Sequence, residues 1–165
     1  AKTEVLIGDG RLLLEQQVRA AGFVPYQVLV VDAFSGDAIP RHLLTRECFE
    51  LYGSAVDLDE GILALHITNG HFDLAPVVLG LAEEAGWSCL EIVGKPKSNL
   101  EEVGQEESHW MLLSRRPKPL EALRQNARGI KESSAERIFW TDDFGSPVQL
   151  LKLPVPSWQI GRAHV

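Results

Sequence analysis

The chain has 165 residues, a length that suits a single domain. With 45% hydrophobic and 24% charged residues it has the composition of a globular protein, which excludes a disordered chain, a collagen-like repeat and a coiled coil. Its 23 acidic and 16 basic side chains give a net charge of −7, which argues against nucleic acid as a partner and favours a cationic substrate.

The first half of the sequence predicts strands alternating with helices. A short buried strand is expected over 5–7 and a helix over 11–21. The run 27–31 is apolar throughout, which is typical of a strand covered on both faces. A loop follows it, and Thr45 is a candidate N-cap for the next helix.

The second half continues the alternation. Strands are expected at 61–67, 88–93 and 109–114, and helices are expected from Leu74 and over 120–127. The helix from Leu74 is the clearest, because apolar residues recur with helical spacing until Gly86 ends it. Together these elements predict an α/β fold with a mainly parallel sheet and flanking helices on each side.

Asp32 is the strongest candidate for a functional residue. In parallel sheets ligands bind beyond the carboxyl ends of the strands, and Asp32 directly follows the strand expected over 27–31. It opens a loop with Ser35 and Asp37. The Asp32 carboxylate either binds and deprotonates a cationic amine or caps the loop, and the sequence leaves both readings open.

Other acidic residues have two readings as well. Asp9, between Gly8 and Gly10, either accepts a hydrogen bond from an amino group of a base or belongs to an ordinary turn. Asp142 and Asp143 follow an aromatic residue, a pattern typical of a solvated turn.

The sequence contains no motif for several other kinds of functional site. His66 ends an apolar strand and is interpreted as an interior histidine, while Cys48 and Cys89 are expected to be buried, reduced thiols. We find no G-x-S-x-G, no Walker loop, no metal-ligand spacing and no G-x-G-x-x-G after the first strand. No apolar run reaches the eighteen or so residues of a membrane span, so no membrane contact is expected within this segment.

One stretch of sequence has a family resemblance. Residues 7–11 and 26–32, with Ala33-Phe34-Ser35-Gly36-Asp37-Ala38-Ile39-Pro40 as the specific part, resemble the spermidine/spermine synthase family, in particular its bacterial branch fused to membrane segments. The likeness covers about 4–150. It implies the C-terminal part of a Rossmann-like class I S-adenosylmethionine-dependent methyltransferase fold.

The resemblance also implies a reaction. This family transfers an aminopropyl group from decarboxylated S-adenosylmethionine, the co-substrate, to putrescine or a similar amine, without a metal or a prosthetic group. By this analogy Asp32 orients and deprotonates the amine with Asp37 as a second acid, and the turn around Asp9 binds adenine. The resemblance also assigns Ser35, Asp142 and Asp143 to the substrate pocket, with Gly8 and Gly10 beside Asp9 at the cofactor side. The family's second acid, three residues after the first, is replaced here by Ser35.

The two ends of the sequence predict a piece of a longer chain. The sequence starts at Ala1 rather than Met, and residues 160–165 match the translation of a common sequencing adapter. We therefore expect a partial catalytic domain over 1–153 and a tail over 154–159. Residues 160–165 are expected to be translated from the adapter and not from the gene. Such a fragment is expected to be inactive and prone to associate, with a homodimer left open. Its domain is expected in the cytoplasm, with a parent protein that could be anchored in the inner membrane.

Two other functions compete with aminopropyl transfer. One is S-adenosylmethionine-dependent methyl transfer, which an acid-lined pocket disfavours because the methyl donor carries a carboxylate. The other is a non-catalytic nucleoside-binding module of a membrane-fused parent, in which Ser35 marks a lost active site.

Overall fold

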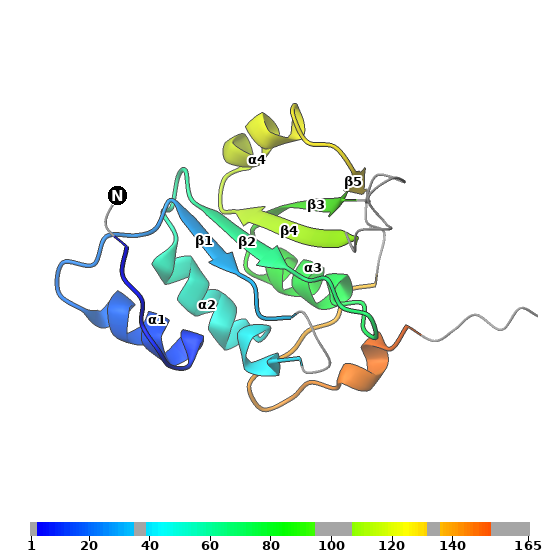
Figure 1. The fold of residues 1–165 in the computed structure, drawn as a ribbon, viewed down its shortest axis with the longest axis horizontal. Helices are drawn as coiled ribbons and strands as arrows, with labels where there is room; N and C mark the ends of the chain where they lie inside the picture. The colour runs from blue at the N-terminus through cyan, green and yellow to red at the C-terminus, as the bar shows by residue number, and fades with distance from the viewer. Residues whose placement is uncertain (1–2, 35–38, 95–106, 132–135, 153–165) are drawn as a thin grey trace, which may run out of the picture.

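The structure, a computed structural model, describes residues 3–34, 39–94, 107–131 and 136–152 (Figure 1). The α-helices are α1 (Gly10–Arg19), α2 (Arg46–Ala55), α3 (Ala75–Glu84) and α4 (Pro117–Arg124). The strands are β1 (Val28–Val31), β2 (Ile62–His66), β3 (Ser88–Gly94), β4 (Ser108–Ser114) and β5 (Ile130–Lys131). Two short 3-10 helices, η1 (Arg41–Leu43) and η3 (Pro147–Leu150), complete the described elements.

The fold is α/β, with one mixed sheet in the order β1-β2-β4-β3-β5. The prediction of a mainly parallel sheet is wrong, because among the described strands only β1 and β2 pair in parallel. The cause is β4, which turns back along β3 and inserts between β3 and β2. An apolar run indicates that a strand is buried but not in which direction its neighbours run.

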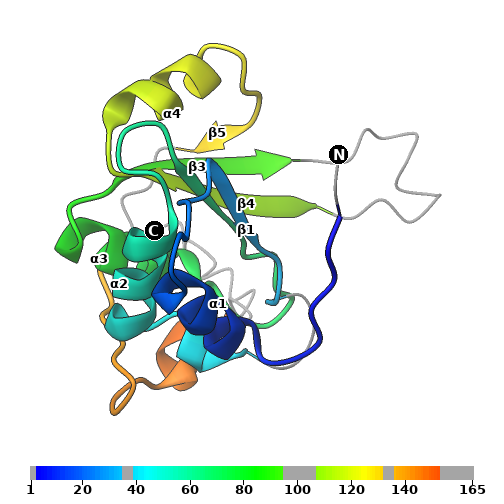
Figure 2. The same cartoon turned by 90° about the vertical axis from the view of Figure 1, so that its left-hand side faces the viewer.

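The helices lie on both sides of the sheet. In Figure 2 the sheet is seen nearly edge-on, with α4 on one side and α1, α2 and α3 on the other. The main core lies on the side of α1–α3, where alternate residues of β2 and β4 are buried: Leu63, Leu65, Met111 and Leu113. On the other side α4 contacts β3 and β4 through a face that includes the buried Leu120.

The prediction of a buried strand at 5–7 is also wrong. These residues form no strand, and Val5 and Ile7 are 81% and 97% exposed. β1 is an edge strand, and its outer residues Val28 and Val30 are exposed, so the expectation that both faces of this strand are covered is wrong too. The two errors have different causes. Residues 5–7 have no described strand beside them to pair with. Val28 and Val30 lie on the face of β1 opposite Leu29 and Val31, and α4, the described helix on that side of the sheet, packs on β3 and β4.

Local signals in the sequence were more reliable. The Oγ1 of Thr45 accepts a hydrogen bond from the Cys48 amide at 3.3 Å, which confirms Thr45 as the N-cap of α2. α3 has Pro76 in its first turn and is closed by Gly86, whose φ of 70° is the left-handed conformation that favours glycine. Capping and helical periodicity act within a few residues, so the sequence alone can reveal them.

Both cysteines are free; Cys48 is buried as predicted, whereas Cys89 is only partly buried. Burial raises the pKa of the Cys48 thiol to about 11 and that of the Cys89 thiol to about 12, so both are protonated at neutral pH. Of the helices in the described part of the chain, none has the length and apolar character that a membrane span needs.

Candidate functional site

Two polar side chains meet where the parallel strands β1 and β2 end. Asp32 follows the last residue of β1, and His66 is the last residue of β2. Because the two strands are parallel neighbours, their carboxyl ends lie at the same edge of the sheet. His66 Nδ1 lies 2.7 Å from Asp32 Oδ1, so the site residue predicted most strongly from the sequence contacts a histidine.

The imidazole of His66 is held from two further directions. Its Nε2 lies 2.7 Å from the Oγ1 of Thr68. Its ring stacks on the indole of Trp110, with centroids 4.4 Å apart and planes at 18°. Only 18% of the His66 side chain is exposed, against 53% of the Asp32 side chain. We call these four residues the Asp32 site, in which a well-packed histidine supports a solvent-accessible carboxylate.

The Asp32 site opens onto a cavity of about 440 Å³ beside β1 and α1. Its walls are mainly apolar and include Leu13, Leu14 and Leu29. Its charged lining residues are Asp32, Glu4 and Arg11. Apolar walls with a few polar groups in a cavity of this size are typical of a small-molecule site.

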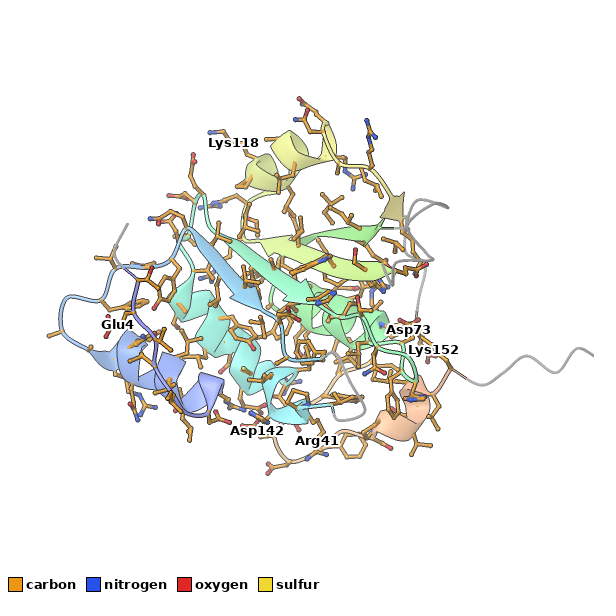
Figure 3. All side chains as sticks on the ribbon, in the orientation of Figure 1. Glu4, Arg41, Asp73, Lys118, Asp142 and Lys152 are labelled. Carbon is orange, nitrogen blue, oxygen red and sulfur yellow. The ribbon has the colours of Figure 1, made fainter. Side chains whose placement is uncertain are left out.

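Asp142 lies in a different cluster, between α1 and the start of α2 (Figure 3). Its Oδ1 and Oδ2 each accept a hydrogen bond of 2.7 Å from the guanidinium of Arg11, and Thr45 Oγ1 donates to Oδ1 at 2.8 Å. The hydrogen bonds from Arg11 hold the pKa of Asp142 below its ordinary value. Since both oxygens are occupied, this carboxylate ties the segment around residue 142 to two helices. Its predicted contact with substrate stays a prediction, as does that of the exposed Asp143.

Asp9 is the N-cap of α1. Its Oδ1 accepts a hydrogen bond from the Leu12 amide at 3.0 Å, which lowers the pKa of Asp9, and its Oδ2 lies 3.1 Å from His42 Nε2. Gly10, the first residue of α1, lines the cavity beside Asp32, whereas Asp9 lines a second cavity of about 390 Å³ with His42. Gly8 precedes the cap. The structure therefore brings Gly10 but not Asp9 to the cavity that Asp32 lines.

Ser35 and Asp37 lie outside the described residues. The residue before them, Phe34, is fully buried, and its carbonyl accepts a hydrogen bond from Asn69 Nδ2 at 3.0 Å. Asn69 lies three residues beyond β2, so the segments that follow β1 and β2 are joined beside the Asp32 site.

Sequence reasoning placed His66 at the end of a strand but interpreted it as an interior histidine, and it missed Thr68 and Trp110. The His66 side chain is largely buried, as that interpretation expects, and it also contacts Asp32. Trp110 carried no signal in the sequence, since it reaches His66 only through the antiparallel pairing of β4 with β2.

Comparison with known protein families and with curated proteins finds no match to this chain. Its chemistry is therefore argued from the site itself. In the described parts of the chain, no three His, Cys, Asp or Glu side chains come together in a way that could hold a metal ion.

Proposed function

We propose that this domain, within its full-length gene product, transfers an aminopropyl group from decarboxylated S-adenosylmethionine to putrescine or a similar amine. The observation that carries the proposal is the Asp32 carboxylate, supported by His66 at the carboxyl ends of two parallel strands and lining a mainly apolar cavity. The family resemblance of the segment from Asp32 to Thr45 supports the same reaction. The mixed α/β sheet is compatible with a Rossmann-like fold, and its finer assignment to the S-adenosylmethionine-dependent class is part of this proposal.

The proposed chemistry needs a base and good alignment. An alkylammonium has no free lone pair, so Asp32 first takes one of its protons. The amine nitrogen then attacks the carbon beside the sulfonium; the C–N bond forms as the C–S bond breaks, and the bonding pair returns to sulfur. The leaving group, methylthioadenosine, departs as a neutral thioether and requires no acid. Most of the acceleration then comes from holding the amine in line with the carbon.

The cavity and the charge of the chain fit such an acceptor. Leu13, Leu14 and Leu29 offer an apolar wall to the methylene chain of a diamine, and Asp32 offers an anion to one of its ammonium groups. Glu4 lines the same cavity, and the cationic lining residue, Arg11, is already paired with Asp142. The net charge of −7 raises the local concentration of a dication.

The test follows methylthioadenosine release by the full-length gene product from decarboxylated S-adenosylmethionine and putrescine. We expect Asp32→Asn to lower turnover by about 100-fold or more, because it removes the base. Asp59→Asn is the matched control, since Asp59 is an exposed acid, and neither it nor its ion-pair partner Arg116 is among the residues that line the cavity. The control is expected to retain full turnover.

Two results would overturn the proposal. Methyl transfer from S-adenosylmethionine without aminopropyl transfer would place the chain among the methyltransferases. Binding of methylthioadenosine by folded protein, without turnover of either donor, would indicate a nucleoside-binding module.

A further inference from the structure

The contact between His66 and Asp32 carries a further inference, which rests on the proposed function. We propose that His66 is the positioning residue of the acceptor site: it holds the Asp32 carboxylate so that Oδ2 faces the ammonium group of the amine. His66 itself touches neither substrate in this arrangement. It acts through the orientation of Asp32.

Asp32 needs such a support because little else holds its side chain. It lies past the end of an edge strand and is 53% exposed. In the described part of the chain its hydrogen-bond partner is His66 Nδ1 on Oδ1, and Oδ2 has no partner. A carboxylate fixed through one oxygen keeps the other available as an acceptor for an N–H donor.

The Asp32 carboxylate determines which nitrogen of His66 carries the proton. A carboxylate oxygen can only accept, so Nδ1 carries the proton and donates it to Asp32 Oδ1 at 2.7 Å. The Nε2 of the neutral imidazole is then an acceptor. Thr68 Oγ1 donates to it at 2.7 Å and itself accepts the His109 amide proton at 2.7 Å.

Trp110 holds the imidazole ring in its plane. The near-parallel stack of the two rings, at 4.4 Å between centroids, prevents the ring from rotating away from Asp32. The hydrogen bonds that link Thr68, His66 and Asp32 are therefore anchored at one end to the backbone of His109 in β4. At the other end they present a carboxylate oxygen of Asp32.

Thr68, His66 and Asp32 are linked in the order hydroxyl, imidazole, carboxylate, as in a catalytic triad of nucleophile, base and acid. Thr68 is unsuited to nucleophilic attack, because its oxygen already accepts the backbone amide proton of His109, which withdraws electron density from it. Thr68 thus anchors the imidazole, and the reactive end of the chain is the carboxylate that lines the cavity.

Three substitutions of His66 separate the hydrogen bond from packing. His66→Asn places an amide N–H near the position of Nδ1 and can still donate to Asp32, whereas the amide nitrogen of His66→Gln reaches the position of Nε2 instead. His66→Phe keeps the stack on Trp110 but has no donor. We expect turnover to fall about 100-fold in the Phe and Gln variants and to stay within about tenfold of wild type in the Asn variant.

Two binding measurements on the full-length gene product complete the test, with folding checked by circular dichroism. Methylthioadenosine is expected to bind all variants within about twofold of wild type, since the donor side does not use this hydrogen bond. Putrescine is expected to bind wild type and His66→Asn but to weaken about tenfold or more in His66→Phe and His66→Gln. The ¹⁵N spectrum of wild-type His66 is expected to show protonated Nδ1 and unprotonated Nε2.

The outcomes keep this inference apart from the proposed function. Suppose that the putrescine affinities of wild type and the three variants follow the predicted order, but wild type turns over no donor. This result contradicts the proposed reaction and supports the positioning role of His66. Equal turnover and putrescine affinity in wild type, His66→Phe and His66→Gln, or an imidazole protonated on Nε2 alone, overturns the positioning role. Wild type that binds no putrescine overturns both.

Discussion

Asp32 and Asp142 are both partly exposed, with 53% and 42% of their side chains accessible, yet their surroundings are opposite. Arg11 binds both oxygens of Asp142, and Thr45 binds one of them again. Asp32 has a partner on Oδ1, His66, within the described residues. The two carboxylates therefore differ little in exposure but clearly in the number of acceptor positions that described residues occupy.

The two carboxylates also differ in what they connect. Asp142 joins residues 131 positions apart in the sequence, so its ion pair with Arg11 holds the C-terminal segment against α1. Asp32 joins the ends of two neighbouring strands that already pair through their backbones. Loss of the first contact should therefore cost stability, and loss of the second should cost activity.

The largest effect on stability is expected from Asp142→Asn. It removes the charge that Arg11 pairs with, and a hydrogen bond to a charged group contributes about 1.5–3 kcal/mol before solvent exposure reduces it. We expect the free energy of unfolding to fall by about 1–2 kcal/mol, against less than about 0.5 kcal/mol for Asp32→Asn. Denaturant unfolding of both variants measures this difference. Equal losses would show that the two carboxylates play the same role.

A smaller loss of stability is expected when Asp142 is neutralised by low pH instead of by substitution. The hydrogen bonds of Arg11 hold the pKa of Asp142 below its ordinary value of 3.8. The stability that this contributes is fully present above 3.8 and is lost as pH falls below that value and through the lower pKa of the folded state. Wild type should lose more stability than Asp142→Asn on acidification from about pH 5 to pH 2. Urea unfolding at a series of pH values measures the two slopes. A steeper slope in the variant would contradict the assignment.

The smallest effect is expected from Asp9→Asn. Asparagine keeps the side-chain oxygen that accepts from the Leu12 amide and is as good an N-cap as aspartate. The charge that is lost faces His42 in a pair that is half exposed on both sides and contributes little. Thermal unfolding should give a Tm closer to wild type than that of Asp142→Asn. If Asp9→Asn lowered Tm more, the Asp9 charge would matter beyond its role as a cap.

A good part of the fold could be predicted from the sequence, because many of its signals are local. The Thr45 cap, the helix that ends at Gly86 and the strand over 61–67 depend on hydrogen bonds or periodicity within one element. The position of Asp32 at the end of a strand was predictable for the same reason. The strand expected over 5–7 failed, since strand formation needs a partner that the local sequence does not contain.

Local sequence signals locate most of the helices and strands, although not β5 or the irregular segment at 5–7, and they place a carboxylate after the first strand of the sheet. The antiparallel insertion of β4 between β2 and β3, which brings Trp110 under His66, follows only from the folded structure. It also shows that Arg11 binds both oxygens of Asp142, whereas Oδ2 of Asp32 has no partner among the described residues. The physical reason is range: capping and periodicity act over a few residues, whereas pairing of distant strands and charges depends on the path of the whole chain.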